Sequence, residues 1–169
     1  ALVRIRKDGN DLLAEPVRLT VWRAPTDNER NLVALWGHQN TKGGENLDRI
    51  FRSVREVVRE KNVISVTGCL AGVGRVPFLR YTLKFAFYND GRMDIMLSAT
   101  VRENCIWLQR LGFEFTILKE NCSFSYFGRG PMENYCDMHG HTTTGVFEST
   151  PEAEYFPYIM PQEHGNHTG

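Results

Sequence analysis

The feature that most constrains this chain is a long alternation of apolar and polar residues. From position 79 to 88 every second side chain is apolar, namely Leu79, Tyr81, Leu83, Phe85 and Phe87. The same pattern returns between 93 and 101, after the turn-forming triplet Asn89-Asp90-Gly91. Successive side chains of a strand point to opposite faces, so this pattern predicts two long antiparallel strands with one apolar face.

Shorter runs of the same kind predict further strands. Val17, Leu19 and Val21 point one way, and residues 111–117 and 122–126 alternate similarly. Residues 2–6 alternate up to the turn signal Asp8-Gly9-Asn10. No β-α-β rhythm appears along the chain. These patterns predict an all-β fold, a large sandwich of antiparallel sheets.

The segment from 47 to 66 fits two interpretations. Its apolar residues up to Val58 have helical spacing, whereas those on either side of Lys61-Asn62 suggest a hairpin. We predict a helical turn near Leu47 to Phe51, followed by strands. Residues 29–46 show no clean period and contain several glycines, which predicts a long excursion.

Composition and charge narrow the class of protein. The 169 residues, 41% of them hydrophobic, are enough for one globular domain with a sizeable core. Twenty basic and twenty acidic residues cancel, which argues against a nucleic-acid module, and no apolar run approaches the roughly 18 residues of a membrane span. Both ends are abrupt, so we expect a piece of a longer chain.

The four cysteines are widely spaced and contain no Cys-x-x-Cys pair, which argues against a thiolate zinc site. We expect buried free thiols, which suit a reducing or a periplasmic setting. The compartment therefore stays open between the cytoplasm and the periplasm.

The stretch from Phe127 to Asp137 is the densest in structural signals. Gly128 and Gly130 can adopt backbone angles barred to other residues, and Pro131 fixes its own φ. Polar side chains follow within five positions. We expect a sharp turn after a strand and an internal polar network that joins Arg129 to Glu133 or Asp137.

This stretch and two others resemble motifs of one enzyme family. Residues 128–137 resemble the Gly-x-Gly-Pro-x-Glu-Asn-Tyr-x-Asp signature in the last domain, or small chain, of glycoside hydrolase family 2 β-galactosidases. Trp22 to Asn28 is similar to the opening motif of that domain. Pro157 to Asn166 is similar to its Pro-Tyr-x-x-Pro-Gln-Glu-Asn-Gly-Asn motif, with His164 in place of the first Asn.

The resemblance implies the β-supersandwich shared with galactose mutarotases. Residues 1–169 would be a single domain, the N-terminal portion of the small-chain domain. In the family the two catalytic carboxylates lie in a separate barrel domain, so the resemblance implies no catalytic residue and no metal site here. The magnesium and sodium ions that such enzymes often use would be bound in other domains. The implied partners are the catalytic barrel, a galactoside at the cleft and further copies of the parent enzyme.

The resemblance also assigns roles to individual residues. The loop after the first motif would border the substrate cleft, through Asp27, Asn28, Arg30, Asn31 and Trp36. The remaining motif residues would be structural, namely Trp22, Arg23, Arg129, Glu133, Asn134, Asp137, Glu163 and Asn166. The residues alone do not decide whether two carboxylates of this chain could act as a catalytic pair. Retaining glycosidases need two carboxylates about 5–5.5 Å apart, and a sequence provides no distances.

Two alternatives remain open at the level of sequence. The first is a free-standing mutarotase-like or sugar-binding protein, in which His139 or His141 would act with Glu163. The second is a purely structural interaction domain. Two histidine pairs, 139 with 141 and 164 with 167, have the spacing of metal ligands but no evident further ligands.

Overall fold

The computed structural model describes residues 2–29, 45–102, 108–118 and 122–168. Within these ranges the regular structure is β-strand, apart from one 3₁₀ turn at 27–29. All strand pairs are antiparallel. The predicted all-β antiparallel class is therefore confirmed. The described residues include no helix that is both long and apolar enough to cross a membrane.

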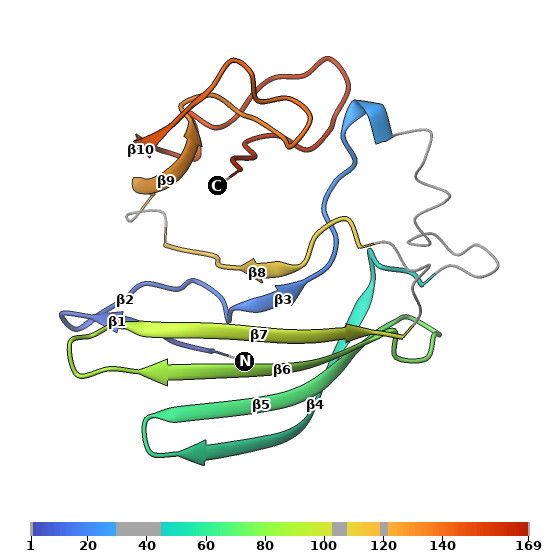
Figure 1. The fold of residues 1–169 in the computed structure, drawn as a ribbon, viewed down its shortest axis with the longest axis vertical. Helices are drawn as coiled ribbons and strands as arrows, with labels where there is room; N and C mark the ends of the chain where they lie inside the picture. The colour runs from blue at the N-terminus through green and yellow to red at the C-terminus, as the bar shows by residue number, and fades with distance from the viewer. Residues whose placement is uncertain (1, 30–44, 103–107, 119–121, 169) are drawn as a thin grey trace. The chain divides into compact units, whose positions relative to one another are not determined.

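The chain forms two compact units, one of residues 31–111 and the other of residues 1–30 and 112–169. The first contains a four-stranded sheet of consecutive hairpins, β4-β5-β6-β7, drawn in green in Figure 1. Its strands are β4 (Ile50–Glu60), β5 (Val63–Gly72), β6 (Leu79–Phe87) and β7 (Met93–Val101). Two compact units can belong to one structural domain, so the assignment of residues 1–169 to a single domain stays a prediction.

The long alternation folds as expected. Leu79 pairs with Val101 and Phe87 with Met93, so β6 and β7 form the predicted hairpin around Asn89-Asp90-Gly91. Leu79, Tyr81, Leu83 and Phe85 are buried, and most of the residues between them are more exposed. The buried Leu70 and Phe78 extend this apolar face.

The predicted helical turn near Leu47 to Phe51 is wrong. Leu47 and Asp48 form a turn, and β4 begins at Ile50 and pairs with β5 along its length. A β-bulge between Val54 and Glu56 adds one residue to β4 and shifts its side-chain alternation. Apolar residues three apart can then share a face, which explains the helix-like spacing. The hairpin around Lys61-Asn62 is confirmed.

The described residues of the second unit form three two-stranded sheets. β1 (Arg6–Lys7) pairs with β2 (Asn10–Asp11) around the expected turn, and β3 (Arg18–Thr20) pairs with β8 (Gly112–Glu114). β9 (Phe124–Gly130) pairs with β10 (Thr143–Ser149). Val17, Leu19 and Val21 are all buried, so the predicted inward face at β3 is confirmed.

Gly130 is needed for space and not for an unusual backbone angle. Neither Gly128 nor Gly130 has a positive φ, contrary to our expectation, and both lie inside β9. A Cβ atom on Gly130 would lie 2.5 Å from the Tyr126 hydroxyl and 2.7 Å from the Phe147 ring. The glycine therefore lets two aromatic side chains close over the end of the strand.

Gly72 lies still closer to its neighbour, the backbone of Glu45. A Cβ there would lie 1.7 Å from the carbonyl oxygen of Glu45, so Gly72→Ala should destabilise the protein by about 1–3 kcal/mol or more. The matched control is Gly112→Ala in β8, where a Cβ meets nothing within 4 Å and φ is not positive. This control should be neutral or raise stability by up to about 1 kcal/mol. Urea denaturation measures both changes, and equal effects would contradict the assignment.

Candidate functional site

The first motif is held by a two-pronged ion pair between Arg23 and Glu29. The Arg23 Nη1 and Nη2 atoms lie 2.7 Å from Glu29 Oε2 and Oε1, and the two side chains are only 14% and 24% exposed. The backbone N–H and hydroxyl of Thr26 also donate to Glu29 Oε2, at 2.8 and 2.9 Å. These bonds close the 3₁₀ turn that presents Asp27 and Asn28, both exposed.

The ion pair shifts the titration of both partners. The hydrogen bond from Arg23 to Glu29 raises the pKa of Arg23, against the opposing effect of burial. Burial alone would raise the pKa of Glu29, but the hydrogen bonds from Arg23 and Thr26 outweigh it and leave that pKa below its ordinary value. Both groups are thus held in their charged forms.

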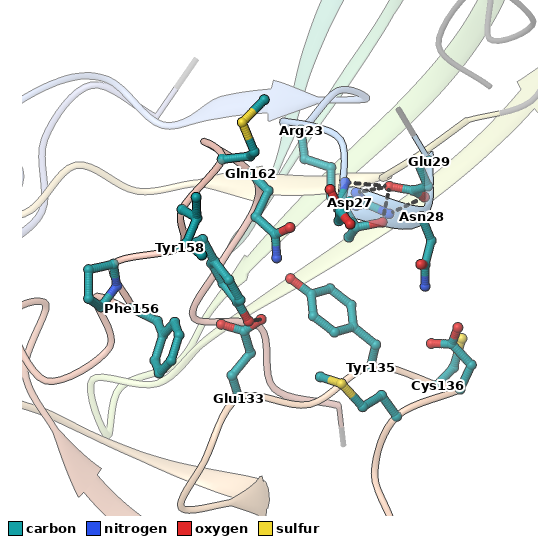
Figure 2. A pocket seen from close by; sticks show the side chains of 16 residues that line it. Arg23, Asp27, Asn28, Glu29, Glu133, Tyr135, Cys136, Phe156, Tyr158 and Gln162 are labelled. Carbon is teal, nitrogen blue, oxygen red and sulfur yellow. Dashed lines mark hydrogen bonds and ion pairs between the residues drawn. The ribbon is translucent and has the colours of Figure 1, made fainter. Parts of the chain in front are cut away.

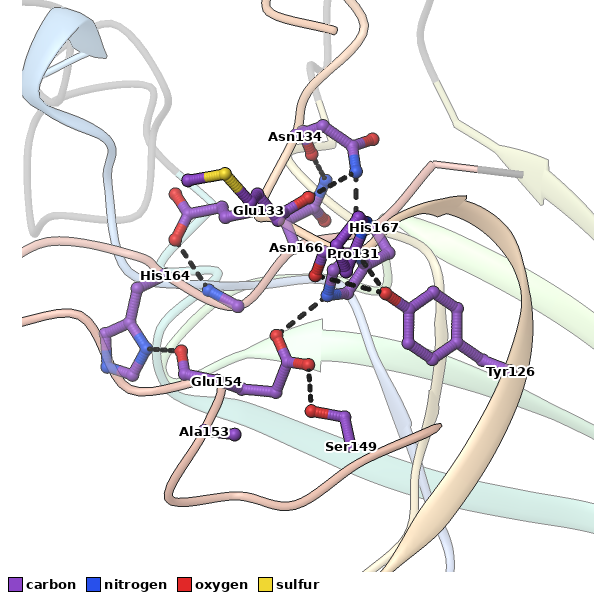
Figure 3. Close-up of polar contacts among 12 residues, drawn as sticks. Tyr126, Pro131, Glu133, Asn134, Ser149, Ala153, Glu154, His164, Asn166 and His167 are labelled. Atoms are coloured by element: carbon purple, nitrogen blue, oxygen red, sulfur yellow. Dashed lines mark hydrogen bonds and ion pairs between the residues drawn. The ribbon is translucent and has the colours of Figure 1, made fainter. Parts of the chain in front are cut away.

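Asn134 is the centre of a second network, shown in Figure 3. Its side chain is fully buried. The Nδ2 group donates to the carbonyl oxygens of Arg129 and Met132, at 2.9 and 3.0 Å, and Oδ1 accepts from the N–H and hydroxyl of Thr168, at 2.9 and 2.6 Å. Every donor and acceptor of the amide is therefore used, as a buried polar group requires.

The backbone around Asn134 extends this network. Its N–H donates to the Asn166 carbonyl at 2.7 Å, while Asn166 Nδ2 donates to the Asn134 carbonyl at 2.6 Å. The N–H of Arg129 donates to the carbonyl of Thr168 at 2.8 Å. Residues 166–168 are thereby bound to the end of β9 and the turn that follows it.

Glu133 links the same turn to the segment 158–165. One carboxylate oxygen accepts from the Tyr158 hydroxyl at 3.0 Å, and the other accepts from the N–H of Gly165 at 2.8 Å. Gly165 has a φ of +70°, which a residue with a Cβ rarely adopts. The second and third motifs are thus joined through a carboxylate whose hydrogen-bond donors, within the described ranges, are neutral.

His167 and Glu154 complete the network. His167 Nε2 lies 2.7 Å from Glu154 Oε2, and its Nδ1 lies 3.0 Å from the Arg129 carbonyl and 3.1 Å from the Tyr126 hydroxyl. The Ser149 hydroxyl donates to the other oxygen of Glu154, so β10 is included (Figure 3). Glu154 was not predicted from the sequence, because it lies outside the three motifs.

A pocket of about 730 Å³ opens between these motifs, within the second unit. Figure 2 shows Tyr135 and Gln162 between Glu133 on one side and Arg23 and Asp27 on the other. Asn28, Glu29 and Asp137 contribute further polar groups, and Cys136, Met138, Phe156, Tyr158, Ile159 and Met160 line the remainder. All three sequence motifs thus contribute to one cavity.

Two tyrosines in the pocket are held in their neutral forms. Burial, together with the nearby carboxylates of Glu133 and Glu163, raises the pKa of Tyr135 far above its usual value. The Tyr135 hydroxyl is buried, and in the described part of the chain it has no hydrogen bond of normal geometry. Burial and the bond to Glu133 also raise the pKa of Tyr158.

Most of the motif residues that were predicted to be structural form hydrogen bonds within or between the motifs. Arg23, Glu133, Asn134 and Asn166 take part in the networks through their side chains. Glu163 donates its N–H to the Pro25 carbonyl at 3.1 Å and so connects the first motif to the third. Trp22 is half-buried, and its indole nitrogen has no hydrogen bond among the described residues.

Arg129 and Glu133 both belong to the expected internal polar network, but among the described residues their side chains do not pair with each other. Within the described residues Arg129 enters the network through its backbone, and the carboxylate of Glu133 is taken by Tyr158 and Gly165. Arg129 belongs to β9, whereas Glu133 lies beyond the turn, where it meets the segment 158–165. Asp137 is exposed at the pocket.

Of the predicted cleft loop, the described residues include Asp27 and Asn28 at the edge of the pocket. Arg30, Asn31 and Trp36 lie outside the described residues. The histidine pairs do not gather a ligand set, since the described residues contain no group of three or more His, Cys, Asp and Glu placed to hold a metal ion. His141 Nε2 instead lies 2.9 Å from the Glu133 carbonyl.

By its fold and by the use of its polar groups, this chain is an all-β domain in which Arg23, Glu133 and Asn134 hold its loops together. Comparison with known proteins identifies its family. A model of the family described as beta galactosidase small chain matches residues 1–169, and the chain belongs to that family.

Individual relatives agree with this assignment. The chain is 28% identical to a beta-galactosidase of Actinobacillus pleuropneumoniae over 98% of its length, and 29% identical to one of Priestia megaterium over 94%. It is also 29% identical to a beta-galactosidase of Kluyveromyces lactis over 89%. The chain spans only 15–16% of the length of these relatives.

The Asn134 network provides a stability prediction. Asn134→Ala leaves several buried backbone groups without partners, at about 1–3 kcal/mol for each group, so we expect a loss of several kcal/mol. The control is Asn62→Ala, which removes one exposed side-chain bond, of 2.8 Å, to the Phe87 carbonyl and should cost about 1 kcal/mol or less. Urea denaturation followed by tryptophan fluorescence measures both. Similar losses in the two variants would contradict the central role of Asn134.

The Arg23–Glu29 pair provides a pH prediction. In the folded protein the pKa of Glu29 lies below its ordinary value of 4.5. The ionised carboxylate therefore stabilises the fold fully above pH 4.5, and this stabilisation is lost as the pH falls through the folded pKa. Glu29→Gln should therefore destabilise the protein by about 1–3 kcal/mol at pH 7, and by less at pH 3. Urea midpoints at the two pH values measure this. A loss of stability that is the same at both pH values would show that the charge of Glu29 is unimportant. The control is Glu148→Gln, at an exposed site on β10.

Proposed function

We propose that this chain is a non-catalytic accessory part of a β-galactosidase, which shapes the substrate cleft and contacts other domains of the parent enzyme. The supporting observation is the small share of each relative's length that this chain matches. The chain matches beta-galactosidases over nearly its whole length, yet accounts for only 15–17% of theirs. Such a match is what a domain used within a larger enzyme produces.

The chemistry of the carboxylates supports the proposal. The parent enzyme would hydrolyse terminal β-D-galactosides with retention, which requires one carboxylate as nucleophile and one as acid/base. Glu29 is held by Arg23, and Glu133 already accepts two structural hydrogen bonds. Both are therefore committed to maintaining the loops. The proposal assigns the catalytic pair to a barrel domain, and the magnesium and sodium ions to other domains.

Asp27 and Asn28 would contribute to the edge of the galactoside cleft, together with Arg30, Asn31 and Trp36. The Arg23–Glu29 pair fixes the turn that carries the first two, so their positions would be set before substrate arrives. The parent would also form contacts with further copies of itself. The mutarotase-like alternative would use His139 or His141 with Glu163, and the ring of His141 already contacts a backbone carbonyl.

An activity assay tests the division of labour. The full-length protein that contains this chain should hydrolyse a chromogenic β-galactoside and release the β-anomer first, as proton NMR detects. Residues 1–169 alone should show no turnover with the same substrate and should not accelerate the mutarotation of fresh α-D-galactose in a polarimeter. Turnover by the segment alone would refute the non-catalytic role, and rapid mutarotation would favour the mutarotase-like alternative.

A further inference from the structure

The pocket has an apolar rim that is unusually exposed. Ile159 is 100% exposed, Phe156 56% and Met160 55%, and Met138 lies at the same cavity. Single exposed apolar side chains are ordinary on a protein surface, but several gathered around one opening mark an interaction site. We refer to residues 156–160 and Met138 as the apolar rim.

The described residues that line the same pocket leave negative charge uncompensated. Among the described residues that line it, Arg23 is the one arginine or lysine, and it is already engaged by Glu29. Among the described residues Glu133 accepts from a tyrosine hydroxyl and a backbone N–H, and none of them supplies a cation to balance it. Asp137 is exposed at the same opening and has no ion pair within the described part of the chain.

An arginine or lysine side chain fits both features. Its aliphatic stem can pack along the apolar rim while its charged end reaches the carboxylates. A guanidinium has the further advantage that it stacks on aromatic faces and pairs with a carboxylate through two hydrogen bonds. The rings of Phe156 and Tyr158 line the pocket beside Glu133.

We propose that the pocket and its apolar rim are the docking surface for another segment of the same full-length polypeptide, which inserts an arginine or lysine side chain between Glu133 and Asp137. The proposal rests on the proposed function, because it takes the occupant from the remainder of the parent chain. The relatives carry this domain as about a sixth of one polypeptide. Segments of one polypeptide meet at a high effective concentration, which favours an intramolecular occupant over a separate protein.

Cys136 reports on occupation of the pocket. It lines the cavity and is exposed in this chain, so a docked segment would cover it. Cys69 is buried and serves as an internal reference. The readout needs no catalytic activity, so it can fail or succeed independently of the proposed function.

The experiment is pulse labelling of the native full-length protein with N-ethylmaleimide, followed by mass spectrometry of the Cys136 peptide. Each rate is divided by the rate for the same variant in urea, which corrects for the effect of a new charge on the thiol. In the wild type we expect Cys136 to react at least about tenfold more slowly in the native state. Native labelling as fast as in urea would overturn the proposal.

Variants separate the two parts of the proposal. Ile159→Arg should remove most of the protection by breaking the apolar contact, and Asp137→Lys should do the same by repelling the inserted cation. Val146→Arg, at an exposed position on β10 outside the pocket, is the control and should leave the protection unchanged. Full protection in Asp137→Lys would refute the inserted cation. Protection that disappears on dilution would assign the surface to a second copy and refute an occupant from the same polypeptide.

Discussion

The buried amide of Asn134 is the interaction on which the rest of the second unit depends. It satisfies two backbone carbonyls on one side and two donors of Thr168 on the other, with no hydrogen-bonding group left over. A shorter or apolar side chain cannot do this, because the carbonyls of Arg129 and Met132 would be buried without partners. The turn after β9 and the segment 166–168 are therefore stabilised together, although more than thirty residues separate them in sequence.

Around this centre, charge is used in two ways. The Arg23–Glu29 pair is compensated and fixes a turn, whereas the described residues offer Glu133 only neutral donors and leave its negative charge in the pocket unbalanced. A loop that needed stability alone would be better served by the first arrangement, since an unbalanced, partly buried carboxylate is costly. The second arrangement makes sense where a cation arrives from elsewhere in the parent protein.

Several features could be predicted from the sequence, and the reason is that they are local. The β6–β7 hairpin follows from alternation and a turn triplet, and the inward face of Val17, Leu19 and Val21 follows from the same rule. Prediction failed where a distant partner decides the outcome. The bulge in β4 depends on its pairing with β5, and the close approach at Gly130 depends on Tyr126 and Phe147.

For the site, the sequence by itself determined which motifs are present and which residue types they bring, because motif resemblance depends only on order and spacing. It could not determine the partners. Glu133 was expected to bind Arg129 four residues away, but it binds Tyr158 and Gly165, and Glu154 had no sequence signal at all. Hydrogen bonds between segments depend on distances and directions that exist only once the chain has folded, so only the tertiary structure decided which carboxylates are compensated and which are not.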